Sequence, residues 1–95
     1  MISNHAYSTE ELLEESVQTL EKDLNHIILF NDDVNTFEWV IECLMQYCDH
    51  DAIQAEQCAH IVHFTGKCAV KKGTLEKLTP ICSALLEKGL SAEIN

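Results

Sequence analysis

Residues 26–33, HIILFNDD, decide the fold because an apolar run ends abruptly in three polar side chains. A short apolar run followed by Asn and Asp residues predicts a buried strand that leads into a polar loop. A helix start follows directly, since Asn35 can cap a helix and Glu38, three residues later, can reach back to it. This part of the chain therefore predicts a strand, a loop and a helix in succession.

Two amphipathic helices are predicted after this loop. The first has an apolar stripe at helical spacing and ends near Tyr47. The second begins with Asp51 as its cap, with Gln54 three residues later, and Gly66 is placed to end it in a left-handed turn. The first stripe consists of Phe37, Val40, Ile41 and Leu44, and the second of Ala55, Cys58, Ala59 and Val62.

The last third of the chain predicts a strand, a helix and a final strand. Residues 67–71 form a short strand with charged ends, and Gly73 is a turn residue. The helix that follows contains Pro80, so it either kinks there or restarts with Thr79 as its cap, and we favour the kink. Gly89 ends the helix, and alternating apolar residues then predict a strand with one buried face. The apolar positions are Leu75, Leu78, Ile81, Cys82 and Leu85 in the helix, and Leu90, Ala92 and Ile94 in the strand.

The predicted order is strand, helix, helix, strand, helix, strand. Three short strands packed against three helices make a two-layer α/β (α+β) sandwich, because no single element can bury its own apolar face. Residues 1–24 are rich in Asp and Glu, and we expect a mobile acidic N-terminal extension there. The folded domain is expected at residues 25–95.

Composition and charge limit the classes of function. Ninety-five residues, of which 46% are hydrophobic and 23% charged, fit one small folded domain without room for a large active-site cavity. The formal net charge of -10 repels phosphate backbones and anionic lipids, so we expect no nucleic acid and no membrane among the partners. The five cysteines lack a CxxC pair, which favours free thiols in a reducing cytoplasm. Neither a secretion signal nor a membrane-spanning run is recognisable.

Two segments carry a resemblance to a known family. The first is residues 28–33, ILFNDD, and the second is residues 62–67, VHFTGK. With a capped helix after the first segment and a helix leading into the second, they resemble the ClpS family of adaptors for Clp-type AAA+ unfoldases, over about residues 26–94. The resemblance implies a non-enzymatic, monomeric adaptor without cofactor or metal. Its partners would be N-degron substrate proteins and the N-terminal domain of the unfoldase.

The resemblance assigns binding of the substrate's α-amino group to Asn31, Asp33 and His63, with Asp32 adding to the electric field or orienting the loop. A protonated amine has three N–H donors and one positive charge, so its receptor needs several acceptors, at least one of them anionic. An amide oxygen, a carboxylate and a neutral imidazole nitrogen meet this need. Taken alone, the loop residues could form an ordinary turn, and His63 could make a local hydrogen bond at a helix end.

An apolar pocket for the substrate's first side chain is expected beside the amine site. Members of the family often have Met where Phe37 and Ala59 stand, and Thr followed by Pro where Asn35 stands. We therefore expect a pocket that is reshaped rather than enlarged. The family's preference for Leu, Phe, Tyr or Trp as the first residue is carried over as an expectation. The residues that the resemblance suggests for the pocket are Leu29, Asn35, Phe37, Val40, Ala59, Val62 and Leu90. All of them except Asn35 are equally expected as core positions.

The third predicted helix contains a candidate contact to the unfoldase. Glu76 matches a family position that contacts the N-terminal domain of the unfoldase, whereas a later lysine of the family is replaced here by Ile81. The surface that docks on the unfoldase can therefore differ from that of other family members. Glu76 is equally well explained as a solvated acid in a first helical turn, where the helix dipole favours it. The acidic extension resembles the one that the family uses in delivery.

Three other functions are compatible with parts of the sequence. A metal site could use Cys48, His50, Cys58, His60 and His63, but their spacing matches no common zinc module. A thiol enzyme would need a cysteine beside His63 on its helix face, and none is there. The stronger alternative is a docking protein of the same fold that modulates the unfoldase without binding N-degrons.

Overall fold

The predicted order of strands and helices is confirmed. In the computed structural model, which describes residues 24–95, the order is strand, helix, helix, strand, helix, strand, and the fold is α+β. The strands are β1 (Leu24–Phe30), β2 (Lys67–Thr74) and β3 (Ser91–Ile94), and the helices are α2 (Phe37–Tyr47), α3 (Ala52–Thr65) and α4 (Leu75–Glu87). The predicted acidic extension lies outside the described residues, except for Leu24, which begins β1. Within the described part of the chain, no helix combines the length and the apolar character needed to span a bilayer.

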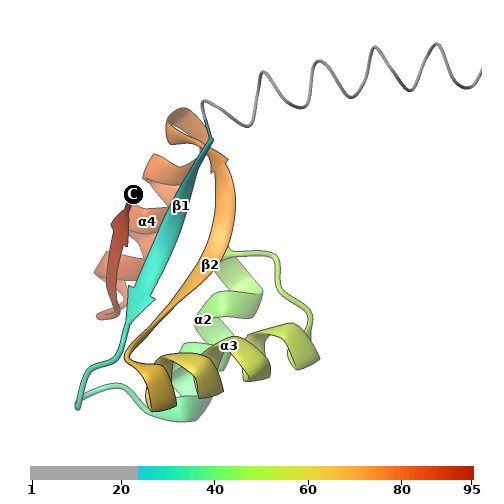
Figure 1. The fold of residues 1–95 in the computed structure, drawn as a ribbon, viewed down its shortest axis with the longest axis vertical. Coiled ribbons are helices and arrows are strands. Elements are labelled where there is room, and N and C mark those ends of the chain that lie inside the picture. The colour runs from blue at the N-terminus through green and yellow to red at the C-terminus, as the bar shows by residue number, and fades with distance from the viewer. Residues whose placement is uncertain (1–23) are drawn as a thin grey trace, which may run out of the picture.

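The central strand of the sheet is β1, with β2 and β3 paired antiparallel on its two edges. Leu24 lies opposite Thr74 at one end, and Phe30 lies opposite both Lys67 and Ser91 at the other. The loop after β1 therefore leaves the sheet where β2 and β3 begin. Figure 1 shows α4 alongside the sheet, and α2 and α3 as a pair at the end where β1 finishes.

The core lies between the sheet and the helices. Ile27 and Leu29 alternate on the buried face of β1, and Leu44, Leu78 and Leu85 join them from α2 and α4. None of these five side chains is more than 1% exposed. Each one contributes roughly 1.5–3 kcal/mol of hydrophobic burial, so the predicted apolar stripes are what hold the two layers together.

The helix ends agree with the sequence-based prediction in part. As predicted, Asp51 caps α3 through its side chain, and Gly66 ends α3 in the left-handed region with a φ of 96°. The cap predicted at Asn35 is wrong. Thr36 caps α2 instead, because its hydroxyl accepts a hydrogen bond from the N–H of Trp39, and the Asn35 side chain is used elsewhere.

The last third of the chain differs from the prediction at Gly73 and Leu75, and it decides between the two alternatives at Pro80. β2 is longer than predicted, because Gly73 lies in the strand opposite Asn25 rather than in a turn. Helix α4 is continuous through Pro80, which excludes a restart at Thr79. The Thr79 hydroxyl donates instead to the carbonyl oxygen of Leu75 at 2.7 Å. Leu75 itself was predicted on the apolar stripe but is 55% exposed in the first turn.

Candidate functional site

The loop between β1 and α2 is organised around the carboxylate of Asp32. Its Oδ1 accepts hydrogen bonds from the backbone N–H groups of Val34 (2.9 Å) and Asn35 (2.8 Å), and its Oδ2 accepts one from the Asn35 side-chain amide (2.7 Å). Burial alone would raise the pKa of Asp32, but these hydrogen bonds, above all those from Asn35, outweigh it and lower the pKa. Asp32 is therefore ionised at neutral pH and holds the loop in shape.

Hydrogen bonds fix this loop to two other segments of the chain. The backbone N–H of Asn31 donates to the carbonyl oxygen of Gly66, at the end of α3 (2.9 Å). The Asn35 amide donates to the carbonyl oxygen of Gly89, in the turn before β3 (2.8 Å). The indole N–H of Trp39 donates to the carbonyl oxygen of Lys88, the residue before Gly89 (3.0 Å). The ends of β1, α3 and α4 are thus held together.

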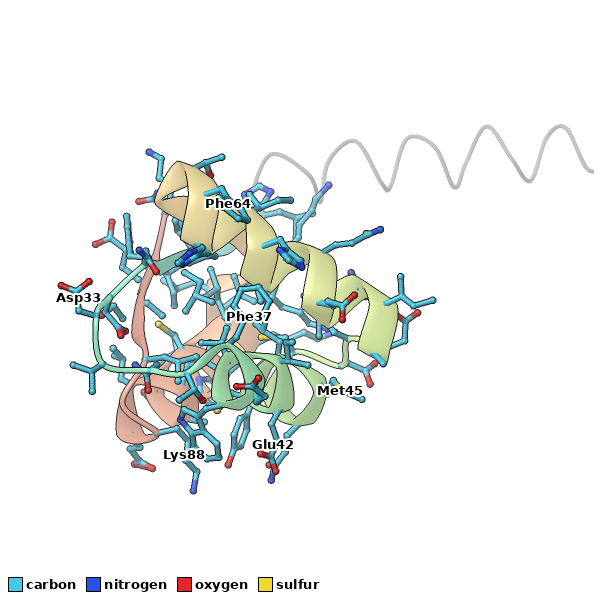
Figure 2. The ribbon with its side chains drawn as sticks, turned by 90° about the horizontal axis from the view of Figure 1, so that it is seen from below. Asp33, Phe37, Glu42, Met45, Phe64 and Lys88 are labelled. Carbon is cyan, nitrogen blue, oxygen red and sulfur yellow. The ribbon has the colours of Figure 1, made fainter. Side chains whose placement is uncertain are left out.

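A cavity of about 380 Å³ opens between this loop, α2 and α3. It combines a polar rim, formed by the loop and the end of α3, with an apolar wall formed by the two helices. In Figure 2, Phe37 lies between α2 and α3, and Asp33 lies at the outer edge of the loop. The lining consists of Asn31, Asp32, Asp33, Asn35, Phe37, Val40, Ala59, Val62 and His63. All four residues predicted to bind an amine therefore line one cavity with five of those predicted for the pocket.

The polar groups of this lining are of two kinds. The side chains of Asp32 and Asn35 are occupied by each other and by the backbone. The side chains of Asn31, Asp33 and His63 are exposed and form no hydrogen bond or ion pair with any other residue in 24–95. Three polar groups that can accept hydrogen bonds, one of them an anion, are therefore available at the same cavity.

The apolar wall comes from the inward faces of α2 and α3. Ala59 and Val62 are 3% and 4% exposed, and Val40 is partly buried. Leu29 and Leu90, which were also predicted to wall the pocket, do not line this cavity but an adjoining void of about 20 Å³. That void shares Val40 and Val62 with the cavity, so the two leucines support the wall rather than form it.

Four aromatic side chains, which we call the ring cluster, lie beside the cavity: Phe37, His60, His63 and Phe64. The ring centroid of Phe37 is 4.7 Å from that of His60 and 6.0 Å from that of His63. The centroid of Phe64 is 6.0 Å from that of His60 and 4.9 Å from that of His63. Each ring therefore contacts two others. Phe64 was not predicted as a site residue, and His60 was named only for the metal-site hypothesis, although their spacing with His63 on one helical face could have indicated them.

The geometry does not favour the metal-site and thiol-enzyme hypotheses. Among residues 24–95, no three His, Cys, Asp or Glu side chains come together as metal ligands would. His50 is only 6% exposed, and its Nε2 lies 2.6 Å from the carbonyl oxygen of Val70, which gives it a structural role. Burial raises the pKa of the Cys48 and Cys58 thiols to about 11. Both thiols are protonated at neutral pH and therefore poor nucleophiles.

Glu76 lies at the opposite end of the sheet from the cavity. It is exposed in the first turn of α4 and lines an open hollow of about 510 Å³ with Thr74, Leu75 and Thr79. Thr74 pairs with Leu24, the first residue of β1, whereas the loop that lines the cavity follows Phe30, the last residue of β1. A strand of seven residues spans roughly 20 Å, so the two surfaces are well separated.

Fold and cavity together define the class of protein: a small α+β domain with a pocket of mixed polarity after its central strand. The family model described as ATP-dependent Clp protease adaptor protein ClpS matches residues 9–93. The chain is 35% identical over 92 residues to the ATP-dependent Clp protease adapter protein ClpS of Synechocystis sp., covering 96% of this chain and 93% of that protein. The chain belongs to the ClpS family, as the resemblance indicated.

Two further relatives agree with this assignment. The ClpS adapter protein of Thermosynechococcus vestitus is 35% identical over 66 residues, covering 68% of this chain and 70% of that protein. The solved structure of Agrobacterium tumefaciens ClpS2 bound to L-phenylalaninamide has a TM-score of 0.66 to this chain and a sequence identity of 19%. That similarity covers 77% of this chain and 95% of ClpS2, and it supports the fold.

Proposed function

We propose that this chain is an adaptor that binds the free α-amino group and the first side chain of N-degron substrates and delivers them to a Clp-type AAA+ unfoldase. One observation carries the proposal: the unpartnered polar groups of Asn31, Asp33 and His63 line a single cavity together with an apolar wall. Membership in the family of Clp protease adaptors supports it. The ligand of ClpS2, L-phenylalaninamide, has a free amine and an aromatic side chain.

The polar rim suits an ammonium group. The amide oxygen of Asn31, the carboxylate of Asp33 and a neutral nitrogen of His63 would each accept one of its three N–H donors. Asp32 would add its charge while holding the loop. The described lining contains no Lys or Arg, so the local field attracts a cation. An acetylated N-terminus lacks the charge and two of the donors, and it is expected to bind much more weakly.

The apolar wall suits a large hydrophobic first residue such as Leu, Phe, Tyr or Trp. Burying such a side chain contributes roughly 1.5–3 kcal/mol, and each charge-assisted hydrogen bond contributes roughly 1.5–3 kcal/mol. After the cost of association, a dissociation constant of about 1 μM is expected. Binding of this strength permits release of the substrate to the unfoldase.

The separation of the two surfaces suits delivery. Glu76 and the hollow around it would dock on the N-terminal domain of the unfoldase, at the far end of β1 from the cavity. Pro80 has no N–H to donate to the carbonyl oxygen of Glu76, which leaves an acceptor at this surface. The acidic extension precedes β1 in the sequence and would take part in delivery, as the resemblance implies. The adaptor would act as a cytoplasmic monomer, without a catalytic residue or cofactor.

Peptides that differ only in their N-terminus test the proposal. Fluorescence anisotropy would compare peptides that begin with free Leu, Phe or Val with their acetylated versions. Free Leu and Phe peptides are expected to bind at least about tenfold more tightly, because one charge-assisted hydrogen bond alone corresponds to that factor. Equally weak binding of both versions, together with intact binding to the unfoldase, would favour the docking-protein alternative.

A further inference from the structure

The ring cluster extends from the cavity onto the outer surface of α3. Phe37 and His63 line the cavity, whereas His60 and Phe64 lie outside it. The ring planes of His60 and Phe64 are within 2° of parallel. Figure 2 shows Phe64 on α3 and Phe37 between the two helices, on the same side of the molecule. Two rings of the cavity lining are therefore in contact with a stacked pair of rings outside it.

The position of Phe64 is not explained by the fold. Its side chain is 75% exposed, so it adds little to the hydrophobic core. The rings of His60 and His63 nevertheless hold it in place. A fixed aromatic surface loses little conformational entropy when another side chain packs on it. An exposed aromatic ring next to a binding cavity is therefore well suited to contact a ligand.

We propose that His60 and Phe64 form a second subsite, which binds the side chain of the substrate's second residue; this inference rests on the proposed function. The subsite favours an aromatic or large aliphatic side chain. The chain of a substrate whose ammonium group is held at this rim would leave the cavity past Phe37 and His63, the rings that line it. The ring centroid of His60 is 4.7 Å from that of Phe37, and the ring centroid of Phe64 is 4.9 Å from that of His63. Successive Cα atoms are about 3.8 Å apart, so the second side chain is within reach of them.

The occupant is the substrate rather than a second copy of this chain. Two of the four rings line the cavity, so a bound substrate is already beside the other two. Its second residue meets them at a high effective concentration. The formal net charge of -10, by contrast, opposes the close approach of two copies.

The test uses peptides that share a free Phe at the first position and carry Phe, Leu or Ala at the second. Fluorescence anisotropy gives Kd for the full chain and for its Phe64→Ala and His60→Ala variants. The peptide with Phe at the second position is expected to bind the unsubstituted chain about three- to tenfold more tightly than the one with Ala. Phe64→Ala is expected to reduce this preference below about twofold, while binding of the Ala peptide hardly changes.

Ile61→Ala is the matched control, because Ile61 is 45% exposed on the same helix but lies outside the ring cluster. It is expected to keep the preference, and thermal melts followed by circular dichroism check that each variant folds. Equal Kd values for all second residues, with acetylation still preventing binding, would overturn the subsite alone. If no free-amine peptide binds, the proposed function fails as well. Self-association that Phe64→Ala abolishes would assign the rings to a second copy and overturn the subsite.

Discussion

The backbone N–H of Asn31 donates a hydrogen bond of 2.9 Å to the carbonyl oxygen of Gly66. This contact joins the residue that leaves β1 to the residue that ends α3, and so brings the loop close to His63. Gly66 occupies this place with a φ of 96°, a region that L side chains rarely adopt. The shape of the polar rim therefore depends on the conformation of one glycine.

Gly66→Ala is expected to destabilise the domain and to weaken peptide binding. A Cβ at this position meets no atom within 4 Å, so the cost comes from the positive φ and is about 1–2 kcal/mol. Urea unfolding measures it. Gly73→Ala is the matched control, because its Cβ would make an ordinary contact of 3.5 Å with Leu78 in an extended strand. Equal stability of the two variants would contradict the strain assigned to Gly66.

Asp33→Ala is expected to affect peptide binding, and Asp32→Ala is expected to affect the stability of the domain. Asp33 has no hydrogen-bond partner among the described residues. Its loss is therefore expected to weaken peptide binding at least about tenfold and leave the melting temperature nearly unchanged. Asp32 accepts three hydrogen bonds within the loop, so its loss is expected to lower the free energy of unfolding by about 1–3 kcal/mol. Unchanged affinity in Asp33→Ala would remove Asp33 from the site.

The stability that Asp32 contributes is expected to disappear in acid. Its pKa in the folded domain lies below the ordinary value of 3.8, so the unfolded chain binds the proton more readily. The contribution is complete above the unfolded pKa and is lost as the pH falls through the folded pKa. The difference in unfolding free energy between the unsubstituted chain and Asp32→Asn is expected to be constant above about pH 5 and to shrink below about pH 4. A difference that is independent of pH would contradict this role.

His63→Ala is expected to weaken peptide binding at least about tenfold, because it removes one of the three acceptors proposed for the ammonium group. His63→Gln keeps a side chain that can accept a hydrogen bond, so it is expected to bind peptides more tightly than His63→Ala. Fluorescence anisotropy measures both affinities. Unchanged affinity in His63→Ala would exclude His63 from amine binding.

Glu76→Ala is expected to weaken binding to the N-terminal domain of the unfoldase while leaving peptide binding unchanged. An exposed charged contact is worth about 0.2–1 kcal/mol, which corresponds to a change in Kd of up to about fivefold. Isothermal titration calorimetry measures both affinities. Glu87→Ala, an exposed acid at the other end of α4, is the control. Identical affinities for the two variants would place the docking surface elsewhere.

Local signals predicted most of the fold, because strand ends and helix caps depend on neighbouring residues. The cap at Asp51 and the left-handed Gly66 are examples. The cap at Asn35 was wrong because its amide is bound by the carbonyl of Gly89, far along the chain. Gly73 was placed in a turn because no local pattern reveals that Asn25 pairs with it. Contacts between distant segments therefore account for these errors.

The candidate site could be predicted only as far as its two main segments. The loop after β1 and the end of α3 were recognisable, and their residues line one cavity. The depth of that cavity depends on how α2 packs on α3. As a result, Leu29 and Leu90 line the adjoining void and not the cavity itself. Phe64 has the apolar character of a core residue, and helical spacing alone does not tell which exposed ring continues a pocket.

The buried cysteines provide an internal measure of how often the domain opens in each of these variants. Cys43 and Cys48 are each 1% exposed, and burial holds the pKa of the Cys48 thiol at about 11. An alkylating reagent can reach these sulfur atoms only when the domain opens, so the labelling rate reports the frequency of opening. Each substitution can thus be ranked by its effect on native-state opening without a dye or an added tag.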